Sequence, residues 1–146
     1  MNILPQKEVP ADILKGSVLA HIAAAYFSVG KRLERKTHCS ATRGFILSTL
    51  RGGTTLNQNQ IARLLGFDRT VVHRAIKSMV QEGLLTERKA KAGRAIHVRL
   101  TTKGNKYREG LIKARVAADD KVGQQMTSVE RETLLRLLRL VADCEF

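Results

Sequence analysis

The chain has few aromatic residues and no tryptophan, with Phe, Trp and Tyr together making up 4% of its 146 residues. Proteins that bind RNA or single-stranded DNA stack bases on aromatic side chains, so this composition disfavours that class. No uninterrupted apolar run reaches the roughly 18 residues of a membrane span. The first residues, Met1 to Glu8, do not have the pattern of a secretory signal. We therefore expect a cytoplasmic protein.

Cysteine is also scarce, and the common catalytic motifs are missing. Cys39 and Cys144 form neither a CxxC pair nor a disulfide framework, which is consistent with a reducing compartment. There is no GxGxxG, GxxxxGK[ST], HExxH or GxSxG motif. His38 and Cys39 are adjacent and supply at most two of the four ligands that zinc prefers. The sequence predicts no enzyme, no cofactor and no metal site.

Acidic groups are few compared with basic ones. The chain has 26 Lys and Arg against 13 Asp and Glu, a formal net charge of +13, and a pI near 10.5. Residues 53–104 hold 10 basic and 3 acidic groups, whereas residues 105–146 hold 8 and 7. Such an excess attracts a polyanion, and its concentration in the middle of the chain predicts a DNA-facing region there.

Two short helices are predicted in that middle region. The first begins at the N-cap residue Asn57 and ends at Gly66. The second begins after Asp68 and ends at Gly83. Apolar residues at helical spacing are expected to face inward: Ile61, Leu64 and Leu65 in the first helix, and Val72, Ile76, Met79 and Val80 in the second.

The remaining faces of the second helix are polar and cationic. In a helix-turn-helix, the second helix lies in the major groove with its N-terminal residues nearest the base edges. The candidate DNA-binding residues here are Arg69, Thr70, His73, Arg74 and Lys77.

A basic hairpin follows these helices. Residues 84–88 and 96–100 read as two strands, the second alternating apolar and polar residues. The hairpin tip has cations and a glycine but no carboxylate, which suits contact with phosphates or a minor groove. A solvated surface loop is the alternative interpretation. The candidate DNA contacts of this wing are Arg88, Lys89, Lys91 and Arg94.

Together these residues resemble the MarR family of bacterial transcriptional regulators. The similarity runs from Ile61 to Gly104, and its most specific part is the strand-to-helix passage Leu-Thr-x-x-Gly at Leu100 to Gly104. The family's wing usually carries Asp-x-Arg, and here Ala92-Gly93-Arg94 stands in that place. The resemblance implies a mainly α fold with a small β-hairpin wing, in which a winged helix-turn-helix is flanked by long dimerisation helices.

The two ends of the chain predict those flanking helices. Apolar residues recur at helical spacing from Leu14 to Leu33, from Tyr107 to Val122, and from Leu134 to Val141. Thr127-x-x-Glu130 is a capping box for the last helix. A lobe at 40–104 is too small to cover all these stripes, so residues 11–37 and 105–146 are predicted to form a homodimer interface within one domain, 1–146. The resemblance implies the same interlocking of first and last helices.

Regulation by a ligand is expected from the resemblance, since members often bind phenolic or aromatic acids between the dimer helices and the DNA-binding lobe. Candidate effector-binding residues are His21, Tyr26, Arg43 and Phe45, with ordinary packing or a solvated cation as the alternative. Cys39 is a redox candidate if basic neighbours lower the pKa of its thiol.

The function expected from the whole sequence is a repressor that binds a pseudo-palindromic operator in double-stranded DNA and is released by an effector. A constitutive or architectural DNA-binding protein, a cysteine-based redox regulator and an RNA-binding winged helix are the alternatives.

Overall fold

The computed structural model describes residues 15–89 and 95–145. The predicted start of the first helix and the wing-tip residues Lys91 to Arg94 lie outside these ranges. The elements follow the predicted order, with one additional short strand. They are α2 (Val18–Thr37), α3 (Ala41–Thr49), β1 (Leu56–Asn57), α4 (Gln58–Leu65), α5 (Arg69–Gln81), β2 (Leu85–Lys89), β3 (Ile96–Leu100), α6 (Thr102–Gly123) and α7 (Ser128–Ala142).

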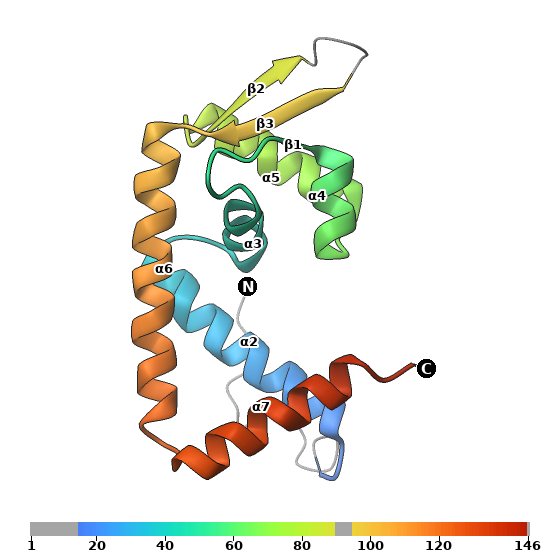
Figure 1. Cartoon of the computed structure of the whole chain (residues 1–146), viewed down its shortest axis with the longest axis vertical. Helices are drawn as coiled ribbons and strands as arrows, with labels where there is room; N and C mark the ends of the chain where they lie inside the picture. The colour runs from blue at the N-terminus through green and yellow to red at the C-terminus, as the bar shows by residue number, and fades with distance from the viewer. Residues whose placement is uncertain (1–14, 90–94, 146) are drawn as a thin grey trace.

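One end of the molecule is a lobe in which α3, α4 and α5 pack beneath a small antiparallel sheet (Figure 1). The strand order is β1-β3-β2. The predicted hairpin is present, with Leu85 opposite Leu100 and Lys89 opposite Ile96. Strand β1 was not predicted, because two residues are too short to show a period; Leu56 pairs with Val98 and Asn57 with His97.

The lobe contains the hydrophobic core. Val72, Ile76 and Met79 of α5 are completely buried, as their spacing predicts, and they join buried residues of α3, α4 and the sheet. The expectation for Leu64 was wrong, since this side chain is 66% exposed. The buried residues of α4 are instead Ile61 and Ala62, with Leu65 half-buried. At 100° per residue these three span one arc of the helix, and Leu64 lies beyond its edge.

Side-chain caps set where the helices begin. Asn57 forms a capping box with Gln60, and Thr127 forms the predicted box with Glu130. Asp68 caps α5, as expected. Gly66 and Gly83 have φ of 65° and 72°, a region that favours glycine, and so allow the chain to turn sharply after α4 and α5.

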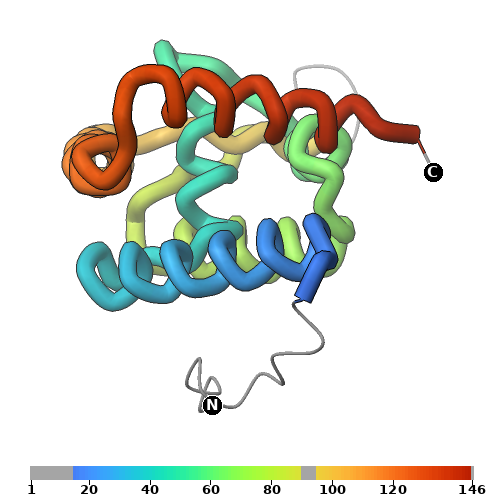
Figure 2. Tube along the Cα trace, turned by 90° about the horizontal axis from the view of Figure 1, so that it is seen from below, coloured from blue at the N-terminus to red at the C-terminus, as the bar shows by residue number. Residues whose placement is uncertain are grey.

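Long helices form the rest of the molecule. Helix α6 runs from the sheet past α3 to α2, and α7 turns back from its far end (Figure 1). Figure 2, which views the molecule from the end opposite the wing, shows α2 and α7 in front of the lobe. Neither α2 nor α7 has a buried residue. Within the described ranges, no helix is both long enough and apolar enough to cross a membrane.

Candidate nucleic-acid interface

Helix α5 presents the predicted polar face to solvent. Its apolar residues are held in the core, so its orientation in the lobe is fixed. The five side chains proposed from the sequence are all exposed: Arg69, Thr70, His73, Arg74 and Lys77. Three of them carry a positive charge and the other two can form hydrogen bonds. A major-groove helix needs both properties. Their contact with DNA remains a prediction.

Asp68 holds the N-terminal end of this helix. Its Oδ1 accepts hydrogen bonds from the backbone N–H of Thr70 at 2.7 Å and of Val71 at 3.3 Å. Both bonds lower the pKa of Asp68, and the bond from Thr70 lowers it most. Val71 follows with an exposed side chain beside the polar face. Its spacing next to the buried Val72 gave no sign of this exposure. An apolar residue at this place can contact a thymine methyl group.

His73 has a partner that no pattern in the sequence indicates. Its Nδ1 lies 3.0 Å from Oε1 of Gln58, the first residue of α4. The two residues are 15 positions apart, and only the packing of α4 on α5 brings them together. The first helix therefore fixes the ring of a candidate base-contacting residue on the second.

The wing extends the basic surface. Arg88 and Lys89 at the end of β2 are exposed, opposite His97 and Ile96 of β3. Arg99 of β3, which was not among the predicted DNA contacts, is exposed too. Lys91 and Arg94 lie outside the described residues.

The Leu-Thr-x-x-Gly passage fastens the wing to α6. The Thr101 hydroxyl donates to the backbone oxygen of Gly83 at 2.7 Å and accepts from the N–H of Gly104 at 2.9 Å. The N–H of Thr101 donates to Leu84 O at 3.0 Å. A Cβ at Gly104 would lie 2.0 Å from that same oxygen. Only glycine lets α6 approach the base of the wing this closely, which gives the motif a physical reason.

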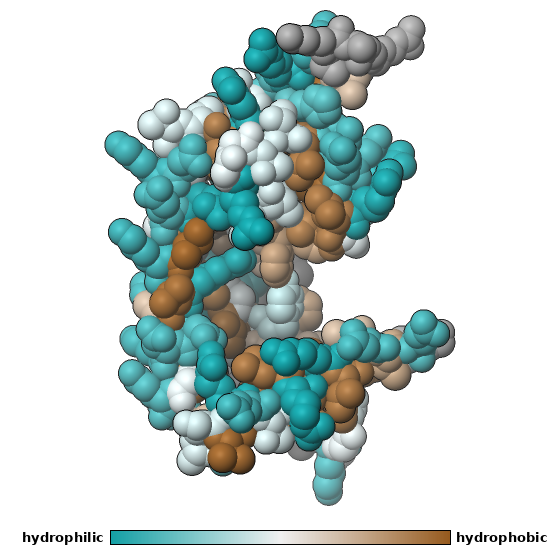
Figure 3. All heavy atoms as spheres, in the orientation of Figure 1, coloured by the Kyte–Doolittle hydropathy of each residue, from teal (hydrophilic) through white to brown (hydrophobic). Residues whose placement is uncertain are grey.

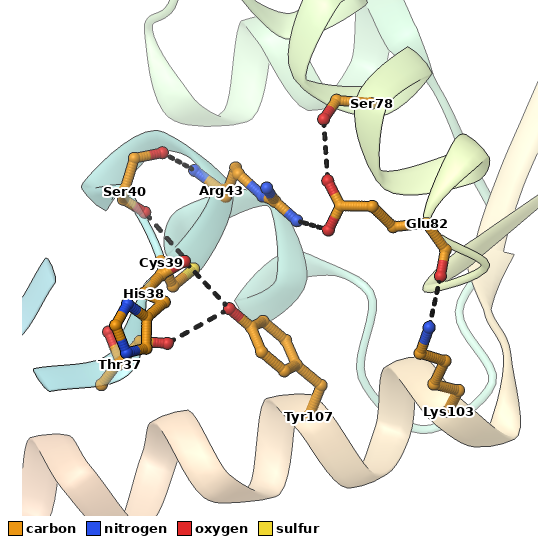
Figure 4. Close-up of polar contacts among 9 residues, drawn as sticks. All are labelled: Thr37, His38, Cys39, Ser40, Arg43, Ser78, Glu82, Lys103 and Tyr107. Atoms are coloured by element: carbon orange, nitrogen blue, oxygen red, sulfur yellow. Dashed lines mark hydrogen bonds and ion pairs between the residues drawn. The ribbon is translucent and has the colours of Figure 1, made fainter.

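Arg43 is not a solvated cation but is tied to the C-terminal end of α5. Its Nη2 donates to Oε2 of Glu82 at 2.5 Å, and Ser78 donates to the other carboxylate oxygen at 2.9 Å (Figure 4). Lys103 of α6 donates to the backbone oxygen of Glu82 at 2.7 Å. The hydrogen bond from Arg43 is the largest cause that lowers the pKa of Glu82. Burial acts to lower the pKa of Arg43, but Glu82 outweighs it and the pKa is raised.

The other effector candidates have separate surroundings. His21 lies at the start of α2, where its Nδ1 is 2.7 Å from Ser17 O, and it lines a hollow of about 360 Å³ walled by apolar residues of α2 and α7. Tyr26 is exposed on α2 against Phe27. Phe45 packs edge-on against Phe67, with the guanidinium of Arg115 over its ring at 5.2 Å. The four candidates thus do not share one set of contacts.

The redox candidate Cys39 is 6% exposed. Burial is the largest influence on its thiol and raises its pKa, although a hydrogen bond with Tyr107 and the charges of Arg43 and Arg115 act in the opposite direction. The predicted lowering of the Cys39 pKa by basic neighbours is therefore wrong, because burial outweighs their charges. A raised pKa leaves less thiolate, which is the reactive form.

Comparison with known proteins agrees with this geometry. Residues 42–95 match the model of the MarR family. No curated protein matches the chain. Among solved structures, the chain is similar to BpsR of Bordetella bronchiseptica, whose DNA binding is regulated by 6-hydroxynicotinic acid, with 19% identity over 89% of this chain and 96% of that one and a TM-score of 0.77.

Two further solved structures are similar along nearly their whole length. PcaV of Streptomyces coelicolor, determined with its natural ligand, is 19% identical over 99% of both chains, with a TM-score of 0.74. The apo form of MarR from E. coli is 18% identical over 91% of this chain and 97% of that one, with a TM-score of 0.72. Residues 42–95 of this chain, from α3 to just before β3, thus match the MarR family model, and the chain as a whole has the fold of these solved regulators.

Proposed function

We propose that the protein is a homodimeric repressor that binds a two-fold symmetric operator through α5 and the wing and is released by an aromatic carboxylate. The observation that carries the DNA-binding part is the exposed face of α5, where Arg69, Arg74 and Lys77 stand on a helix whose opposite side is fully buried. Cations placed on a rigid helix can contact phosphates and base edges without further ordering.

The apolar faces of α2 and α7 support dimerisation. Leu134, Leu137 and Leu138 of α7 are 41, 45 and 39% exposed, and Val18 and Phe27 of α2 are both 60% exposed. Figure 3 shows apolar atoms gathered along α7. Large apolar patches of this kind mark association surfaces. A two-fold dimer would present two copies of α5 to half-sites one helical turn apart, so residues 11–37 and 105–146 form the proposed dimerisation region and 40–104 the DNA-binding lobe.

The ion pair of Arg43 and Glu82 supports release by an anionic ligand. Glu82 is the C-cap residue of α5, and Arg43 lies in the first turn of α3. A carboxylate that binds Arg43 would compete with Glu82 and free the end of the recognition helix. The regulation of BpsR by 6-hydroxynicotinic acid favours a ligand of this class. Among the alternatives, a constitutive DNA-binding protein would lack this response, and the buried Cys39 disfavours a redox regulator.

The test is a screen of phenolic and aromatic acids for two effects measured together. A true effector should raise the melting temperature and lower affinity for the operator, because coupling between two sites is one free energy seen from either side. Arg43→Ala should lose this response, whatever its starting affinity, whereas Arg35→Ala, a change at an exposed cation of α2, should keep it. If no compound moves either quantity at millimolar concentration, the constitutive alternative holds.

A further inference from the structure

Gln58 and His73 form a pair at the DNA-facing end of the helix-turn-helix. Gln58 is half-buried at the start of α4, directly after the capping residue Asn57, so its backbone is held in place. His73 is exposed in the second turn of α5. The distance of 3.0 Å between His73 Nδ1 and Gln58 Oε1 is that of a hydrogen bond.

This bond determines where the ring carries its proton. With the Gln58 amide oriented so that Oε1 faces the ring, Nδ1 is the donor, because an amide carbonyl oxygen can only accept. A neutral imidazole has a single N–H, and the hydrogen bond made by one nitrogen decides the state of the other. The second nitrogen, Nε2, is therefore left with a lone pair and acts as an acceptor. Among the described residues, it has no hydrogen-bond partner of its own.

We propose that Gln58 is a positioning residue that makes His73 an acceptor, so that α5 reads the exocyclic amine of the base pair where His73 enters the groove. In the major groove, adenine N6 and cytosine N4 are amine donors, whereas guanine and thymine present oxygen acceptors there. Every base pair holds one such amine and one such oxygen, so a lone pair on Nε2 favours the orientation of the pair that turns the amine toward His73. The inference rests on the proposed DNA-binding function of α5.

The first measurement needs no DNA. Nitrogen NMR of the His73 ring in the free protein, at about pH 8.5 so that an ordinary imidazole is neutral, reports which nitrogen carries the proton. We expect the proton on Nδ1 in the wild type and a loss of that preference in Gln58→Met, which has a similar length but no oxygen. A proton on Nε2 in the wild-type ring would overturn the proposal.

The second measurement selects binding sites from a pool of randomised duplexes at the same pH. The position at which His73→Ala loses its base preference identifies the contacted base pair. At that pair, an analogue that lacks the exocyclic amine should lower the affinity of the wild type by about five-fold or more, and that of Gln58→Met by less than about two-fold. Gln81→Met, the same change at an exposed residue of α5, should respond like the wild type.

Two outcomes contradict the proposal: an affinity that falls when the oxygen acceptor of that pair is removed rather than its amine, or an effect of the amine that survives in Gln58→Met. Failure of the proposed function looks different, because then no duplex is enriched by any variant while the NMR result on the free protein still stands. The melting temperatures of Gln58→Met and Gln81→Met show that both variants are folded.

Discussion

At the scale of single residues, the hydrogen-bond and ion-pair partners of Arg43 and His73 determine what these side chains can bind. The sequence identified Arg43 as a possible ligand-binding cation, and the structure pairs it with Glu82, 39 positions along the chain. It also placed His73 on the DNA-facing side of α5 but gave no sign of Gln58 beside it. Side-chain pairs between elements depend on how helices pack, and a hydrophobic period does not specify that packing.

The first prediction concerns base reading by Arg74, which is exposed on the polar face of α5. If its guanidinium contacts a base edge, Arg74→Ala should weaken binding to the operator by roughly 1–3 kcal/mol and binding to random DNA much less. Fluorescence anisotropy at fixed salt measures both affinities. Arg136→Ala, at an exposed cation of α7, is the control and should change neither. Equal losses on both DNAs would make Arg74 a phosphate contact instead.

A second prediction concerns acid and the ion pair of Glu82. A carboxyl whose pKa is lowered on folding stabilises the fold above its ordinary pKa, here 4.5, and this contribution disappears as pH falls through the lowered value. Glu82→Gln should therefore reduce the free energy of unfolding by about 1 kcal/mol at pH 7, with a difference from wild type that shrinks as the pH falls below 4.5 and vanishes below the lowered pKa.

Urea unfolding across this range measures the effect. Glu87→Gln, at an exposed carboxylate of β2, is the matched control and should track the wild type at every pH. A difference between Glu82→Gln and wild type that grows toward low pH would have the wrong sign for this ion pair.

At the scale of elements, local sequence signals were reliable where a cap and a period coincide. Asp68 caps the start of α5 and Gly83 follows its end, as predicted. The capping box of Thr127 and Glu130 begins α7, also as predicted. Strand β1 was missed because two residues have no readable period. Leu64 was placed inward although it is exposed, because in a helix of eight residues an apolar side chain at the edge of the stripe can fall on either side.

The passage from β3 to α6 gives a prediction for Gly104. Adding a Cβ there brings it to 2.0 Å from the backbone oxygen of Leu84, and this atom cannot move without shifting the base of the wing. Gly104→Ala should therefore destabilise the fold by about 3 kcal/mol or more. Gly110→Ala, in the same helix with nothing within 4 Å of its Cβ, should instead stabilise it by roughly 0.5–1 kcal/mol. Thermal unfolding of both variants measures this difference. Equal stabilities would contradict the close approach of Gly104 to Leu84.

At the scale of the whole molecule, the exposed apolar faces of α2 and α7 have no role in a monomer. The sequence predicted these stripes, yet no pattern within one chain specifies how two copies fit together. The hollow lined by His21 and by Leu134, Leu137 and Leu138 lies on these faces. A second copy of the chain is the occupant that the proposed function requires.

Charges placed on α7 test this interface. Leu134→Glu with Leu138→Glu sets two carboxylates on the proposed apolar contact, where unpaired burial costs several kcal/mol, so the protein should sediment as a monomer. Val129→Glu, on the opposite side of the same helix by its spacing, should leave the dimer intact. A folded dimer of the double variant would exclude this surface, and a folded monomer should lose operator affinity because linked binding of two half-sites is gone.

The central claim is that two copies of α5 read duplex DNA together. Footprinting of the protein on the DNA that flanks its own gene tests it most directly. We expect protection of two major-groove segments about 10–10.5 base pairs apart, centre to centre, and loss of this protection in Arg74→Ala. Protection of one isolated segment, or no protected site at any salt concentration, would contradict it.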